Sequence, residues 1–241
     1  RMVAFISLEN YEREQAYGEA ELRLVSTIAA SMGVALDNAR LFKETQEALQ
    51  QQTATSDVLG VISRSMGDAA PVLDAILEKC EVLIDESVGS SITLIGDDGM
   101  AQGAHFRLNA AGKAFFDTPA AADALVQQLR SRPPSPLAGN PVERVLQAGR
   151  AVIYPDVVHG PDVPDSLRKV AHLLLRGQEG TYALLAVPLF NNGRGLGAIS
   201  VARSRTGGFS DKEIALLQTF ADQAVVAIEN ARLFRFGRAH V

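Results

Sequence analysis

The chain has 241 residues, of which 47% are hydrophobic and 21% charged, a composition typical of globular domains rather than of disordered or fibrous proteins. Its net charge of −5, without a cluster of lysines or arginines, argues against direct nucleic-acid binding. Cys80 is the single cysteine, which excludes an internal disulfide and a cysteine-rich zinc site and favours a cytoplasmic protein. The longest apolar run, residues 182–190, is too short for a membrane helix, and we find no signal peptide.

An internal repeat begins at the N-terminus. Residues 19–42 and 211–234 match at 11 of 24 positions without a gap, and both copies end in NARLF. Strands are expected just before them, at residues 2–8 and 195–203, and residues 5–8 resemble residues 198–201. The same strand–loop–helix unit therefore closes two successive domains. We interpret residues 1–42 as the last strand and last helix of an upstream domain, and we expect the chain to be a piece of a longer protein.

A long helix is predicted over residues 19–65, because the segment after the first NARLF is rich in the helix formers Gln, Glu, Ala and Leu. Its final part, residues 43–65, is assigned as a coiled-coil-like linker. A weak heptad seam follows the helix at seven-residue spacing: Val34, Leu41, Ala48, Thr55 and Ile62. We expect a homodimer through Val34, Leu41, Ile62 and the helix at 211–236. A solvated linker helix is the alternative interpretation.

Residues 66–236 alternate short helices and strands, as expected for one complete domain. Helices are predicted over 71–85, 120–131, 141–148 and 164–176, and strands over 90–95, 100–107, 151–154, 182–190 and 195–203. Hairpin turns are indicated by GDDG at 96–99 and by NNG at 191–193. Gly149 is expected to end a helix, and a capping box of Ser210 and Glu213 to begin the last one. The proline-rich residues 133–141 predict a loop.

Four stretches of this segment resemble the GAF family: CEVLID, NPVERVLQAGRAVIYPDV, LLAVPLFNNGRGLGAISVARS and FSDKEIALLQTFADQAVVAIENARLF. The resemblance covers residues 55–236, with the end of a second member at 1–42. In this arrangement the chain is similar to the tandem GAF modules of bacterial sensor histidine kinases. It implies an α+β, GAF/PAS-like fold with a five- to six-stranded antiparallel sheet and helices on both sides. The terminal helices would pack on one side, often as a dimer bundle, and a pocket would lie on the other.

Motifs for catalysis or metal binding are absent from the sequence, so we expect no enzyme activity and no metal site in this segment. The four histidines have no metal-ligand spacing. The glycines at 193, 195 and 197 belong to a hairpin, whereas a phosphate-binding loop needs strand–loop–helix order. Cys80 lies on the apolar face of its helix and is expected to be a buried, inert thiol. GAF relatives that attach bilins or reduce methionine sulfoxide use cysteines that this chain lacks.

Candidate ligand-binding residues are the polar groups of the pocket-side segments: Tyr154, Asp156, His172, Arg176 and Tyr182. They would orient a ligand while apolar walls bury it. Each also has an ordinary explanation, since Asp156 could cap a turn, His172 and Arg176 could lie on a solvated helix face, and Tyr182 could be a core ring.

Two functions therefore stay open, and neither the ligand nor a cofactor is identified. The first is a sensor that binds a small molecule and passes a helix rearrangement to a downstream output domain such as a histidine kinase. The second is a ligand-free dimerisation and relay module.

Overall fold

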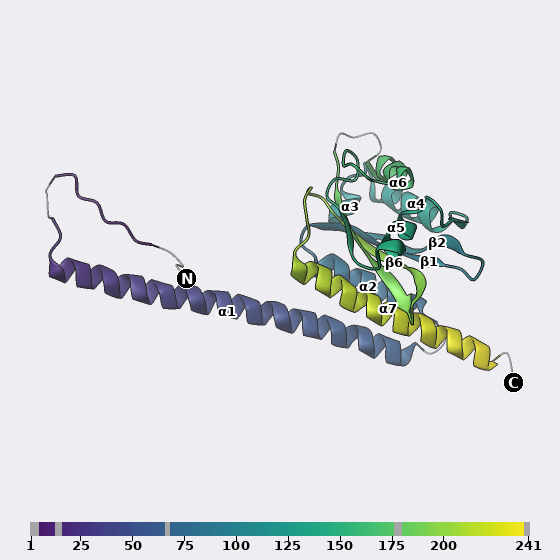
Figure 1. Ribbon diagram of the computed structural model, residues 1–241, viewed down its shortest axis with the longest axis horizontal. Coiled ribbons are helices and arrows are strands. Elements are labelled where there is room, and N and C mark those ends of the chain that lie inside the picture. The colour runs from purple at the N-terminus through teal and green to yellow at the C-terminus, as the bar shows by residue number, and fades with distance from the viewer. Residues whose placement is uncertain (1–4, 13–15, 66–67, 176–179, 239–241) are drawn as a thin grey trace. The chain divides into compact units, whose positions relative to one another are not determined.

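A computed structural model describes residues 5–12, 16–65, 68–175 and 180–238 (Figure 1). The chain divides into two compact units, Arg1–Thr53 and Ala54–Val241, and the division falls within the linker predicted at residues 43–65. The predicted long helix is confirmed as α1 (Glu19–Arg64), which contributes residues to both units. None of the described helices is long and apolar enough to cross a membrane.

The strand predicted at residues 2–8 is wrong over the part that the structure describes, because residues 5–10 form neither strand nor helix. Residues 2–4 lie outside the described residues. A strand is stable only when a neighbouring strand takes up its backbone hydrogen bonds. The sequence pattern of a strand is present here, but no strand in the described part of the chain pairs with it.

The second unit is built on one six-stranded antiparallel sheet, which confirms the predicted α+β fold (Figure 1). The strand order is β3-β2-β1-β6-β5-β4. The strands are β1 (Ser87–Ile95), β2 (Met100–Leu108), β3 (Ser135–Pro136), β4 (Val152–Tyr154), β5 (Ala183–Asn191) and β6 (Arg194–Arg203). Both predicted hairpins form, and the β5–β6 turn has positive φ at Asn192 (48°) and Gly193 (82°), as a two-residue hairpin turn requires.

Strand β3 falls in the segment predicted to be a loop. Ser135 and Pro136 pair with Ala101 and Met100 at the outer edge of the sheet. Proline cannot donate a backbone hydrogen bond, so it is tolerated in a sheet at such an edge. The proline-rich composition therefore led to a loop prediction, although a short strand forms there at an edge position that tolerates proline.

One face of the sheet is covered by α2 (Ala70–Leu83), α7 (Asp211–Arg238) and the end of α1, which together enclose the main hydrophobic core (Figure 1). Alternate residues of β5 point into this core, and all of them are fully buried: Ala183, Leu185, Val187 and Leu189. They meet apolar side chains of α2 and α7 such as Ile76, Leu217 and Phe220. The predicted capping box forms at the start of α7, where Ser210 and Glu213 exchange hydrogen bonds.

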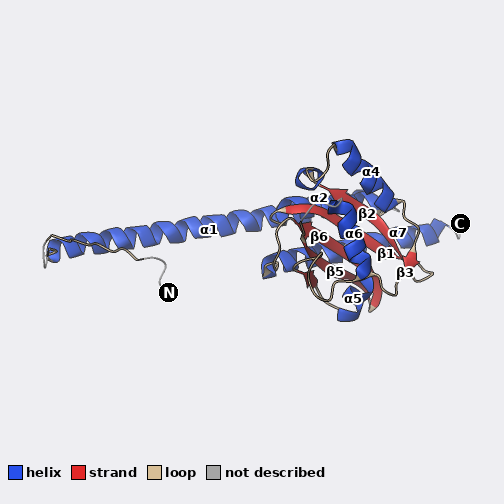
Figure 2. Cartoon of the chain, turned by 90° about the horizontal axis from the view of Figure 1, so that it is seen from above, coloured by secondary structure: helices blue, strands red, loops and turns tan. Residues whose placement is uncertain are grey.

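The opposite face carries four shorter helices, and Figure 2 shows α6 in front of the strands. They are α3 (Ala110–Lys113), α4 (Pro119–Arg130), α5 (Pro141–Ala148) and α6 (Asp165–Leu175). Helices α3, α4 and α5 begin at side-chain caps, namely Asn109, Thr118 and Asn140. Helix α5 ends at Gly149 with φ 61°, as predicted. The four-residue α3 was not predicted, because so short a helix has no apolar periodicity.

Candidate ligand cavity

A cavity of about 470 Å³ lies between the sheet and helices α3, α4, α5 and α6. Its floor consists of small residues on the sheet face that points away from α2 and α7: Gly103, Ala186, Ala198, Ser200 and Ala202. Strand alternation explains this placement, since the neighbours Val187, Ile199 and Val201 point into the main core. Small side chains on the floor leave the space that larger residues fill on the other face.

The walls of the cavity are mostly apolar. Strand β2, the segment between α3 and α4, and α4 itself contribute Phe106, Leu108, Phe115, Phe116 and Leu129. Helices α5 and α6 contribute Val142, Val145, Leu167, Val170 and Leu174. Both the volume and the apolar lining are typical of small-molecule sites, which span roughly 300–1,000 Å³. Burial of an apolar ligand body would therefore drive binding.

Tyr154 is a predicted site residue that the structure places in the cavity lining. Its side chain is 3% exposed, and its buried hydroxyl has no hydrogen-bond partner among the described residues. Burial raises the pKa of Tyr154, against the opposing influence of the Arg144 guanidinium, whose carbon lies 5.6 Å from the ring centre. Buried hydroxyls are nearly always hydrogen-bonded. Tyr154 therefore has an unmet hydrogen-bonding group beside the cavity, among the described residues.

Tyr182, the second tyrosine of the prediction, also lines the cavity. It is buried beside Tyr154 in a small apolar cluster that includes Leu167 and Leu184. Burial raises the pKa of Tyr182 well above its ordinary value. The phenol is therefore neutral at physiological pH.

Two other predicted site residues, Asp156 and His172, are not found in the lining. Asp156 caps a turn, since its Oδ1 accepts hydrogen bonds from the backbone of His159 at 2.7 Å and from the Thr181 hydroxyl at 2.6 Å. Burial disfavours its charge, but these hydrogen bonds outweigh that effect and lower the pKa of Asp156. His172 is exposed on α6 outside the lining. Arg176 lies outside the described residues.

Several polar residues of the lining were not predicted. Ser91 and Ser200 face each other on the neighbouring strands β1 and β6, and both line the cavity. Arg132 and Lys169 also belong to the lining, and both are exposed, which places them at its rim. One sequence signal was available, because Ala198, Ser200 and Ala202 alternate with the large apolar residues of β6. Such a series of small residues indicates a strand face that is not packed by large side chains.

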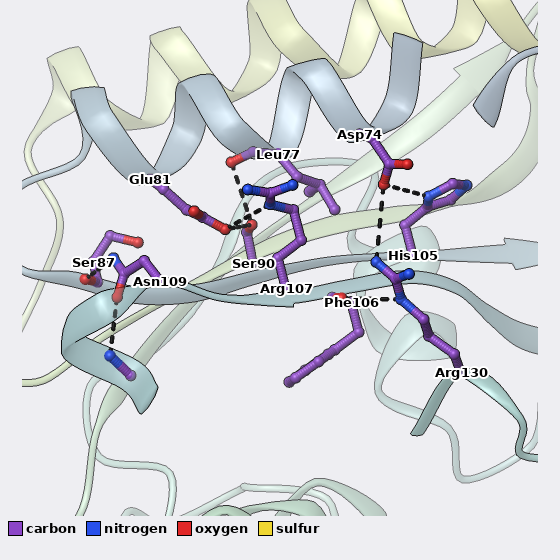
Figure 3. Close-up of polar contacts among 11 residues, drawn as sticks. Asp74, Leu77, Glu81, Ser87, Ser90, His105, Phe106, Arg107, Asn109 and Arg130 are labelled. Atoms are coloured by element: carbon purple, nitrogen blue, oxygen red, sulfur yellow. Dashed lines mark hydrogen bonds and ion pairs between the residues drawn. The ribbon is translucent and has the colours of Figure 1, made fainter. Parts of the chain in front are cut away.

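A polar network joins the cavity wall to α2 across the edge of β2 (Figure 3). His105 Nδ1 lies 2.9 Å from Asp74 Oδ1 on α2. Arg130, at the end of α4, donates from Nε to the carbonyl of Phe106 at 3.1 Å, and its Nη2 lies 3.9 Å from the same Asp74 oxygen. Figure 3 shows α2 on one side of the strands and Arg130 on the other. His105 and Phe106 both line the cavity, so the network touches the site directly.

A second pair fixes α2 to the same strand. Arg107 on β2 donates from Nε to Glu81 Oε1 on α2 at 3.0 Å (Figure 3). The Glu81 side chain is largely buried, so this is a partly desolvated ion pair rather than a surface contact. Helix α2 is thus connected to β2 at two places, Asp74 and Glu81, about two helical turns apart.

Residues 68–229 match the family model described as GAF domain. The chain belongs to the GAF family. GAF domains are commonly regulatory or sensory modules in signalling proteins. In this GAF domain the family match begins after α1, whereas the compact unit begins at Ala54 within it.

Solved structures with the same fold are similar to this GAF domain at low sequence identity. The GAF domain/HD domain protein from Geobacter sulfurreducens aligns with a TM-score of 0.52 at 18% identity, over 69% of this chain and 95% of that one. The GAF domain of a phosphoenolpyruvate-protein phosphotransferase from Coxiella burnetii aligns with a TM-score of 0.55 at 14% identity, over 77% and 96%. The free methionine-R-sulfoxide reductase from Neisseria meningitidis aligns with a TM-score of 0.54 at 14% identity, over 78% of this chain and 93% of that one. A search of curated proteins found no match.

The single cysteine of this GAF domain lies away from the cavity. Cys80 is fully buried on α2, in the core on the opposite face of the sheet. Burial, with a smaller contribution from the charge of Glu81, raises the pKa of the Cys80 thiol. A thiol that stays protonated and buried is a poor nucleophile. No group of three or more His, Cys, Asp or Glu residues in the described part of the chain could hold a metal ion.

Proposed function

We propose that this GAF domain is the sensor module of a bacterial signal-transduction protein. It binds a small molecule in the cavity and passes a helix rearrangement to a downstream output domain such as a histidine kinase. The observation that carries the proposal is an apolar cavity of about 470 Å³ whose lining includes Tyr154, a residue with a buried hydroxyl that has no hydrogen-bond partner among the described residues. A buried polar group without a partner is costly, so a ligand that supplies one gains affinity. No catalytic role is assigned to the chain, and its free thiol fits a cytoplasmic module.

The Asp74 network supplies a route for the signal. A ligand that moves α4 or β2 changes the positions of Arg130 and His105, and both of these residues contact Asp74 on α2. Helix α2 packs against α7 within the main core. Occupancy of the cavity on one face of the sheet would in this way alter the helices on the other face. A conformational change needs such contacts that differ between the two states.

Output is proposed to pass through a parallel homodimer formed by α1 and α7. In α7 the repeat positions Leu216 and Ala227 are buried against the sheet, whereas Val226 and Leu233 are exposed. Val34 and Leu41, which match Val226 and Leu233 in the repeat, are exposed too. Apolar residues at a seven-residue spacing in both copies suit a helical seam. Ile62, also predicted for this seam, is partly buried against the domain's own core.

Native mass spectrometry of the full chain tests the sensor proposal. The protein is purified without added ligand, and its intact mass is compared before and after unfolding. We expect a small molecule that is retained in the native state and released on unfolding. Hydrogen exchange in α2 and α7 should then differ between the loaded and the stripped protein. The ligand-free relay module would be favoured instead if every preparation had the native mass of the protein without a bound molecule. The protein would then be a stable dimer, and hydrogen exchange in α2 and α7 would not differ between preparations.

A further inference from the structure

We propose that the cavity selects an anionic amphiphile, a small molecule with an apolar chain or ring and a single carboxylate. This inference rests on the proposed sensor function, because it names the chemical class of ligand for the same site. It is carried by three features of the lining: the sign of the charges at the rim, the kind of polar groups inside, and the apolar walls.

The charges of the lining are of one sign. Arg132 and Lys169 are its two cationic side chains, and no aspartate or glutamate occurs among the described residues that line the cavity. Neither of the two cations has an ion-pair partner among the described residues, whereas Arg107, Arg194 and Arg203 are each paired with a carboxylate. A cleft with charges of one sign and low-dielectric walls attracts a ligand of opposite charge.

The polar groups inside the cavity are mainly hydroxyls. Tyr154 contributes to the lining with a hydroxyl that has no partner among the described residues, and Ser91 and Ser200 form the cross-strand pair on the floor. Hydroxyls donate readily to ligand oxygens, and hydrogen bonds to charged acceptors are about twice as strong as neutral ones. An ammonium ligand would find no carboxylate in the described lining and would be repelled by the two cations at the rim. The interior therefore favours a ligand rich in acceptors over a cationic one.

The apolar walls indicate that the part of the ligand other than its charged group is apolar. Phe106, Phe115 and Phe116 with the leucines of α4 and α6 enclose most of the cavity. A fully polar anion such as phosphate would leave these walls without contact, while an apolar chain or ring buries them. The combination of apolar walls with cations at the rim points to one molecule that carries both an apolar body and a terminal negative charge.

Three probes of equal chain length test this proposal with the full chain: octanoate, octan-1-ol and octylammonium. We expect octanoate to bind about tenfold more tightly than octan-1-ol at low salt, as measured by calorimetry, and octylammonium to bind more weakly than either. The double variant Arg132→Gln/Lys169→Gln should reduce the preference for octanoate over octan-1-ol to about twofold, with binding of octan-1-ol unchanged. Arg150→Gln is the control, since Arg150 is exposed and outside the lining.

The outcomes separate this inference from the proposed function. Equal binding of octanoate and octan-1-ol, or tighter binding of octylammonium, would overturn the anionic class while supporting a ligand cavity. An unchanged preference in the double variant would overturn the role of the two cations. If none of the three probes binds, the class is overturned as well, whereas a small molecule found by native mass spectrometry would leave the sensor function intact.

Discussion

Arg203, the last residue of β6, forms a buried ion pair with Glu213 in the first turn of α7. Arg203 Nη2 lies 3.2 Å from Glu213 Oε1, and the guanidinium stacks on Phe209 at 3.8 Å from the ring centre. The same glutamate accepts hydrogen bonds from the backbone and hydroxyl of Ser210, which cap the helix. One carboxylate thus fixes both the start of α7 and its attachment to the sheet.

Replacing Arg203 should destabilise the domain strongly. Arg203 is 1% exposed, so Arg203→Met leaves the Glu213 carboxylate without its partner in a mostly dry site. We expect a loss of about 3 kcal/mol in the free energy of unfolding, measured with urea. Arg205→Met is the matched control, because Arg205 pairs with Glu86 at the surface and should cost about 0–1 kcal/mol. Equal losses in the two variants would contradict a structural role for the buried pair.

Tyr154→Phe should separate stability from ligand binding. The substitution removes a buried hydroxyl that has no partner among the described residues, so the ligand-free protein should be as stable as before or more stable by about 1 kcal/mol. Retention of a co-purified molecule in native mass spectrometry should fall at the same time. A large loss of stability would mean that the hydroxyl already has a structural partner, such as bound water.

The buried thiol should make stability depend on pH in the alkaline range. In the unfolded chain Cys80 ionises near its ordinary pKa of 9.0, whereas burial raises its pKa in the folded domain. Its contribution to stability is therefore fully present below pH 9 and is lost as the pH rises, by about 1.4 kcal/mol per pH unit. The stability difference between the wild type and Cys80→Ala should shrink accordingly between pH 8 and 10.5.

Labelling of Cys80 gives an independent check of the same burial. A thiol reagent should react slowly with the native protein and rapidly with the urea-unfolded one. Fast labelling of the native state, or a stability difference that does not change with pH, would show that the thiol is accessible.

The folding unit should begin within α1 rather than where the family match starts. Val58 is fully buried in the main core, while its neighbour Leu59 is 50% exposed. We expect Val58→Ala to cost about 2 kcal/mol and Leu59→Ala less than about 0.5 kcal/mol. A chain of residues 54–241 should melt cooperatively, and one of residues 68–241 should melt at a lower temperature. Identical melting of these two chains would place the boundary after α1.

Self-association should depend on the exposed apolar positions of α7. Val226 and Leu233 are 50% and 67% exposed, so the double change to aspartate should leave the fold intact. It should weaken the proposed dimer in analytical ultracentrifugation, because like charges would face each other across the seam. Asn230→Asp, an exposed site on the same helix, is the control for added charge. A monomeric wild type at high concentration would contradict the dimer itself.

Local signals explain why most elements could be predicted from the sequence. The Asn192–Gly193 turn, the left-handed Gly149 and the capping box of Ser210 and Glu213 each depend on residues a few positions apart. The failures have a physical reason too. The strand expected at residues 2–8 lacks a partner in the described chain, and β3 is a strand only because β2 lies beside it.

The sequence alone determined the order of the longer helices and strands and indicated the family, because hydrophobic periodicity and turn chemistry act over short distances. The tertiary structure decided the composition of the site. Tyr154 and Tyr182 line the cavity. The Asp156 carboxylate instead caps a turn and accepts a hydrogen bond from Thr181, a residue 25 positions away. Ser91 and Ser200 meet only through the register between β1 and β6. Which polar groups face a ligand depends on strand pairing and on the space left by small side chains, and both arise from contacts distant in the sequence.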